Sequence, residues 1–153
     1  LLIRLLLNGT TLTEAMKYAS EELMPHVPAQ EHEELRRVLT GSVTDEPESS
    51  IESGGYVVHC LEASLWCAAR NGSYADAVLA AVNLGEDTDT TAAVTGGLAG
   101  VLYGLEAIPR EWRDAIARRE EVVTLAAAFA DIVCRFPYEQ ARGESPTIKG
   151  GRS

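Results

Sequence analysis

Apolar residues recur along the chain at the three- and four-residue spacing of amphipathic helices, and no segment alternates polar and apolar residues as a half-buried strand would. We therefore predict an all-α fold. The predicted helices cover residues 1–7, 12–24, 28–39, 56–70, 74–84 and 91–104, a short stretch from 109, and 121–136.

Start and stop signals support these boundaries. Thr11 and Glu14 have the spacing of a capping box, in which each side chain accepts a hydrogen bond from the other residue's backbone N–H. Gly9 and Gly41 follow helical patterns directly, where glycine commonly ends a helix. Residues 41–55 are polar and show no periodicity, and a loop of this length inside a compact domain is usually functional or disordered.

The two segments with the least ordinary composition are predicted to pack in the interior. Residues 56–70 are apolar or small on nearly all sides, which is typical of a core helix. Residues 91–104 contain four glycines, each costing about 1 kcal/mol relative to alanine in a helix. Gly96, Gly100 and Gly104 share one helix face, so we expect a neighbouring helix to approach closely there.

An acidic loop joins the helical patterns 74–84 and 91–104. Gly85 suits a left-handed residue just after a helix end, and Asp89 or Thr90 could cap the next helix. Asp87 and Asp89 supply hard oxygen ligands of the kind that magnesium or calcium prefers. Local pattern alone favours a simpler interpretation, in which these carboxylates complement the helix dipole. An EF-hand does not fit, because Leu98 stands where that loop needs its bidentate glutamate.

Composition narrows the function classes. The chain has 153 residues, enough for one domain, and its net charge of −10 argues against a nucleic-acid partner, which would require a basic face. Three cysteines in no metal-like cluster predict buried, reduced thiols and a cytoplasmic protein. The apolar run at residues 1–7 is too short to span a membrane. It resembles the inside of a helix that begins upstream, and residues 143–153 are predicted to form a flexible tail.

Three motifs in order carry a family resemblance. The letters G-E-D-T-D-T-T-A-A at residues 85–93, followed by the glycine-rich stretch to Gly104, resemble the metal-binding motif of the ADP-ribosylglycohydrolase family. The letters S-G-G-Y-V-V at residues 53–58 resemble the glycine loop and helix of that family, and residues 108–112 resemble its I-P-x-x-W. The family fold is an all-α orthogonal bundle, and the resemblance identifies residues 1–142 as the C-terminal part of such a domain.

The resemblance implies a site with two Mg²⁺ ions that hydrolyses the bond between the terminal ribose of ADP-ribose and a protein side chain or small group. By position, Asp87, Asp89 and Thr90 would be metal ligands, with Asp89 bridging the two ions. Gly54, Gly55 and Tyr56 would line the ADP-ribose groove. Glu86 stands where the family has a further glycine, so the chain departs from the motif there.

The resemblance also implies that a second ligand cluster, a Ser/Thr-Asp-Asp from an N-terminal half supplied in cis or in trans, is missing here. Because each Mg²⁺ requires about six oxygen ligands, the chain alone should bind metal weakly and show little or no hydrolase activity. The alternative is a non-catalytic helical module that binds ADP-ribose weakly or self-associates. Exposed apolar faces such as residues 1–7 would favour a homo-oligomer in either case.

Overall fold

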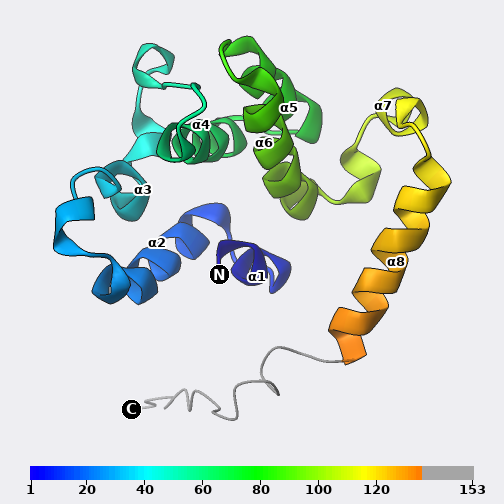
Figure 1. Ribbon diagram of the computed structural model, residues 1–153, viewed down its shortest axis with the longest axis horizontal. Helices are drawn as coiled ribbons and strands as arrows, with labels where there is room; N and C mark the ends of the chain where they lie inside the picture. The colour runs from blue at the N-terminus through cyan, green and yellow to red at the C-terminus, as the bar shows by residue number, and fades with distance from the viewer. Residues whose placement is uncertain (136–153) are drawn as a thin grey trace. The chain divides into compact units, whose positions relative to one another are not determined.

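The computed structural model describes residues 1–135, and within that range the chain is all-α, as predicted, with no strand (Figure 1). The longer helices are α1 (Leu2–Leu7), α2 (Leu12–Leu23), α3 (Arg36–Thr40), α4 (Val57–Arg70), α5 (Tyr74–Asn83), α6 (Thr88–Tyr103), α7 (Arg110–Ala115) and α8 (Arg119–Arg135). Short 3-10 helices are η1 (Met24–His26), η2 (Ala29–Glu31), η3 (Ser42–Asp45), η4 (Glu48–Ser50) and η5 (Leu105–Ala107). The predicted tail, residues 143–153, lies outside the described residues.

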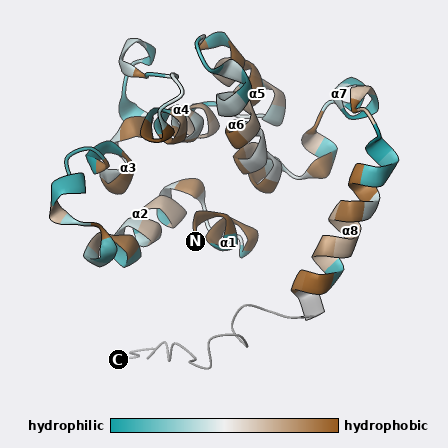
Figure 2. Ribbon diagram, viewed as in Figure 1, coloured by the Kyte–Doolittle hydropathy of each residue, from teal (hydrophilic) through white to brown (hydrophobic). Residues whose placement is uncertain are grey.

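The chain divides into two compact units, Leu1–Pro109 and Arg110–Ser153. In the first unit, α4 is the central helix and packs against α5 and α6, while α1 contacts both α2 and α6. Figure 2 shows α1 and α4 as largely hydrophobic and the segment between α2 and α3 as largely hydrophilic. Most residues of α4 are buried, including Ala63, Leu65 and Cys67, so the prediction of a core helix is confirmed.

The glycines of α6 do permit close packing, although only in part as predicted. A Cβ added at Gly96 would lie 3.2 Å from Tyr74 Oη and 3.7 Å from Val78 Cγ2 of α5, and one at Gly100 would lie 4.0 Å from Tyr74 Cε2. The tyrosine of α5 therefore occupies the space that these glycines leave. Gly104 has a different role, because it ends α6 with a φ of +80°.

Two local predictions at helix ends can be compared directly with the structure. The capping box is confirmed, since the Thr11 hydroxyl accepts from Glu14 N and the Glu14 carboxylate accepts from Thr11 N. The prediction that Asp89 or Thr90 caps α6 is wrong. The cap residue is Asp87, without a side-chain cap bond, and the helix begins at Thr88. Asp89 and Thr90 therefore lie inside its first turn.

The predicted helix over residues 28–39 is not continuous. The chain forms η2, then turns, and only Arg36–Thr40 is α-helical. Most of the stability of a helix in a protein comes from packing an apolar face, and this segment is mainly charged. Its few apolar anchors are concentrated near Val38 and Leu39, where the helix does form.

The second unit also departs from prediction. Helix α8 forms where the periodicity predicted a helix, but its apolar stripe does not face an interior. Leu125 is 73% exposed and Phe129 is 66% exposed. Among the described residues, no helix is long and apolar enough to cross a membrane.

Candidate functional site

The acidic loop turns sharply between α5 and α6. Gly85 has a φ of +88°, which confirms the predicted left-handed residue, and Glu86 follows with a φ of +55°. Left-handed backbone strains any residue with a Cβ, so Glu86 occupies a position at which glycine would be easier. This explains in physical terms why a second glycine suits the motif. Asp87 is half-buried, whereas Asp89 and Thr90 are exposed at the start of α6.

The two aspartates of this loop interact. A side-chain hydrogen bond with Asp87 lowers the pKa of Asp89, and the backbone N–H groups of Thr90 and of Asp89 itself lower it further. Thr90 N donates to Asp89 Oδ1 at 3.0 Å. The Asp89 carboxylate therefore stays ionised in more acidic solution than an ordinary aspartate. An ionised carboxylate beside a second carboxylate at an exposed helix N-terminus is chemically suited to a hard cation.

Ser53 connects this acidic loop to the glycine loop, residues 53–56, across 32 positions of sequence. Ser53 Oγ donates to the carbonyl oxygen of Gly85 at 2.9 Å, and Asp87 N donates to Ser53 O at 3.1 Å. Ser53 is only 3% exposed, while Gly85 and Asp87 are half-buried, so both bonds are partly shielded from water. Sequence reasoning placed the two loops in one site but missed this serine, whose only signal was its place next to the glycine pair.

Gly54 and Gly55 lie directly against the acidic carboxylates. A Cβ added at Gly54 would lie 2.9 Å from Glu86 Oε2, and one at Gly55 would lie 3.5 Å from Asp87 Oδ2. Four predicted or motif residues from two distant segments are thus brought together at one place. Because Gly54 and Gly55 carry no side chains, the backbone of the glycine loop is open at these two positions, beside the carboxylates.

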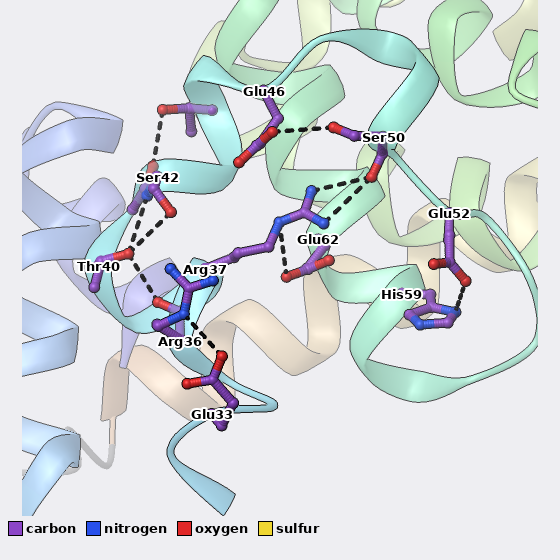
Figure 3. Close-up of polar contacts among 12 residues, drawn as sticks. Glu33, Arg36, Arg37, Thr40, Ser42, Glu46, Ser50, Glu52, His59 and Glu62 are labelled. Carbon is purple, nitrogen blue, oxygen red and sulfur yellow. Dashed lines mark hydrogen bonds and ion pairs between the residues drawn. The ribbon is translucent and has the colours of Figure 1, made fainter.

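Tyr56, the remaining predicted groove residue, caps α4 and is 45% exposed. Its hydroxyl donates to the Glu34 carboxylate, and that bond is the main reason that the pKa of Tyr56 is raised. The ring meets His59 edge-on, with centroids 5.1 Å apart and planes at 88°. His59 Nδ1 in turn lies 3.3 Å from Glu52 Oε2, and Figure 3 shows the two side chains facing each other. These contacts fix the tyrosine ring while leaving much of its surface accessible.

The acidic loop offers the type of ligand that a magnesium site needs, but too few of them to complete one. Asp87, Asp89 and Thr90 offer oxygen donors, which Mg²⁺ prefers. Yet in the described part of the chain no three His, Cys, Asp or Glu side chains gather into a group that could hold a metal ion. The loop can thus supply one side of such a site. Cys60 and Cys67, which are free and buried in α4, offer no alternative ligand set, and burial raises the pKa of Cys67 to about 12.

Comparison with known proteins gives a consistent result. The family described as ADP-ribosylglycohydrolase matches residues 1–137. ADP-ribosylarginine hydrolase Tri1 of Serratia proteamaculans is 34% identical over 82% of this chain, and Tri1 of Pseudomonas putida is 34% identical over 84%. ADP-ribosylhydrolase ARH3 of Danio rerio is 32% identical over 58% of the chain.

The chain spans about a third of the length of the two Tri1 proteins, 32% and 33%, and about a quarter of the Danio rerio ARH3, 24%. The family match nevertheless covers most of the chain, including both loops of the site. On this basis, the chain belongs to the ADP-ribosylglycohydrolase family.

Proposed function

We propose that this chain forms one side of a magnesium-dependent site that removes ADP-ribose from a protein side chain or a small conjugate. The observation that carries the proposal is the junction of the two loops, in which Ser53 joins the glycine loop to the acidic loop and Gly55 lies against Asp87. The relatives' names support the substrate class, since they describe hydrolases of ADP-ribosylated arginine or of ADP-ribosyl groups.

Each part of the junction has a role in this proposal. Asp87, Asp89 and Thr90 would hold Mg²⁺, which when bound supplies positive charge for gripping ribose hydroxyls and lowering the pKa of a water. An aspartate carboxylate is ionised at neutral pH, and the hydrogen bonds that lower the pKa of Asp89 keep its carboxylate available to a cation in more acidic solution as well. The bare backbone of Gly54 and Gly55 lets the ribose and phosphates approach, and the accessible ring of Tyr56 can stack on a base.

Water would supply some of the remaining oxygen ligands, since Mg²⁺ usually keeps several waters, and for tight binding others would come from protein outside these three residues. The 125 and 129 matched residues make up only 32% and 33% of the two Tri1 proteins, which therefore have room for such a segment. We therefore propose that the 153-residue chain alone binds magnesium weakly and turns over slowly or not at all. Supplying the N-terminal part of the parent protein should restore hydrolysis.

An activity assay tests the proposal. ADP-ribose release from ADP-ribosylated arginine and serine peptides is measured for the chain with and without the N-terminal part, at several Mg²⁺ concentrations. We expect magnesium-dependent release only when both parts are present, and its loss in the Asp87→Asn, Asp89→Asn variant. The control is Asp45→Asn, which removes one exposed carboxylate away from the junction. Equal release by both variants would contradict the proposed site.

One observation favours a second candidate, a non-catalytic module that binds ADP-ribose weakly or self-associates. Among the residues that the structure describes, no third acidic, cysteine or histidine side chain joins Asp87 and Asp89 to form a metal-binding group. This candidate predicts binding of ADP-ribose without release from conjugates, even when the N-terminal part is present.

A further inference from the structure

Arg37 lies at the crossing of α3, α4 and the long loop that leads into Ser53. Both of its terminal guanidinium nitrogens donate to the carbonyl oxygen of Ser50, at 3.2 and 3.3 Å. Figure 3 shows Arg37 between Ser50 and Glu62, while its neighbour Arg36 pairs with Glu33. The contact joins positions 13 residues apart in sequence and fixes a loop carbonyl by charge-assisted hydrogen bonds.

Glu62 is the counter-charge that keeps this arginine in place. It lies on the core helix α4 and is 5% exposed. Arg37 Nε lies 3.5 Å from Glu62 Oε1, close enough for an ion pair, although the geometry leaves Nε without a hydrogen bond. Burial raises the pKa of Glu62, and the charge of Arg37 opposes that rise. A buried carboxylate is costly unless it is paired, so an apolar residue would serve packing alone at least as well.

The same loop is held at two further points by donors from α4. Trp66 Nε1 donates to Glu46 O at 2.8 Å, and Arg70 donates to Thr44 O at 3.3 Å. Side chains from helices thus reach three backbone carbonyls, those of residues 44, 46 and 50, in a segment that has only short 3-10 turns of its own. The contact of Arg37 is the last of the three before the glycine loop.

Only two residues separate Ser50 from Ser53, and Ser53 makes the hydrogen bonds to the acidic loop. A shift of the Ser50 carbonyl would therefore move Ser53, Gly54 and Gly55 relative to Asp87. Neither Arg37 nor Glu62 belongs to the proposed ligand set, and both act on it only through this short backbone path.

We propose that Arg37 and Glu62 are positioning residues that hold the glycine loop against the acidic loop, and so set the affinity of the site for ADP-ribose. This rests on the proposed function for the ligand, but the loop contact itself does not. Arg37 fixes the loop through its two hydrogen bonds to the Ser50 carbonyl. Glu62, on α4, holds the Arg37 guanidinium in the position from which it makes these bonds.

The test compares Arg37→Met with Arg36→Met, a matched change at the neighbouring position, where the ion pair with Glu33 is exposed. Backbone hydrogen exchange of peptides covering residues 46–55 is measured in the whole chain, and ADP-ribose is titrated with Mg²⁺ by NMR. We expect exchange in this segment to rise, and ADP-ribose affinity to fall, by at least about tenfold in Arg37→Met only. Arg37→Lys keeps the charge and should give a smaller effect, which covers the case in which Arg37→Met fails to fold.

The two readouts separate the inference from the function on which it rests. If the Arg37 variants exchange like Arg36→Met in residues 46–55, the positioning role is wrong whatever the ligand does. If exchange rises but ADP-ribose affinity stays at the wild-type value, the loop does not set affinity and the inference is again wrong. If the wild-type chain binds no ADP-ribose at all, the proposed function fails, and the exchange comparison alone decides whether Arg37 positions the loop.

Discussion

Replacing Ser53 by alanine removes one hydroxyl from the junction between the glycine loop and the acidic loop. Its Oγ is the donor to Gly85 O at 2.9 Å, and the residue is 3% exposed, whereas Gly85 is half-buried. Because the acceptor is only partly shielded from water, losing the bond should cost about as much as a typical intramolecular hydrogen bond contributes, about 0.5–1.5 kcal/mol. Alanine keeps the backbone carbonyl of residue 53, so the bond from Asp87 N at 3.1 Å can persist. We therefore expect a loss of about 0.5–1.5 kcal/mol in the free energy of unfolding.

Urea denaturation followed by circular dichroism measures this loss, and the matched control is Ser49→Ala. Ser49 is exposed in η4, where surface substitutions usually change stability by less than about 0.5 kcal/mol. The urea dependence of unfolding should stay the same in both variants, because neither changes the surface exposed on unfolding. Equal stability of the two variants would show that the Ser53 hydroxyl does not join the loops, and would refute the geometry from which the site is built.

Three further changes test other parts of the structure. Glu86→Gly should leave the chain as stable or stabilise it by up to about 1 kcal/mol in urea denaturation, because relief of the left-handed strain outweighs the added freedom of the unfolded chain. Glu62→Gln should remove a pH dependence of the free energy of unfolding. Because the pKa of Glu62 is raised in the folded state, the stability that this group contributes is fully present below pH 4.5 and is lost as pH rises through the raised pKa. Leu125→Asp with Phe129→Asp should reduce concentration-dependent association in sedimentation velocity, because these exposed side chains share the apolar face of α8.

Each of these predictions has an outcome that would contradict it, and two of them have a control variant. Glu22→Gly, on the exposed side of α2, should cost about 1 kcal/mol, and a similar cost at Glu86 would show that no strain is present there. Parallel stability profiles of wild type and Glu62→Gln between pH 4.5 and neutrality would contradict a raised pKa. Ala127→Asp, on the opposite face of α8, should leave association unchanged, and a wild-type chain that stays monomeric at high concentration would rule out this surface.

The helices of the first unit could be predicted from sequence because local signals and burial agree there. The Thr11 capping box, the Gly85 stop and the apolar surround of α4 each act within a few residues. The predictions were wrong where the outcome depends only on whether apolar side chains find an interior to pack against. Residues 28–39 have good helix formers but little apolar surface to bury, and the stripe containing Phe129 has the right period but stays exposed.

The site shows the same division. Asp87, Gly54 and Gly55 were predictable because motif spacing marks them, and the structure brings them together. Ser53 and the buried pair of Arg37 with Glu62 were not, because a hydrogen bond across 32 residues and an ion pair between α3 and α4 leave no periodic signal in sequence. A charged residue within an apolar helix pattern was the only available hint at Glu62.

Isothermal titration calorimetry of the 153-residue chain with Mg²⁺ and ADP-ribose, beside the Asp87→Ala, Asp89→Ala variant, tests the central claim most directly. We predict weak binding of ADP-ribose that requires Mg²⁺ and disappears in the variant, because in the proposed site these two carboxylates would hold the metal. Binding that persists without Mg²⁺ and in the variant, or no binding by the wild-type chain, would contradict a surviving half of a metal site.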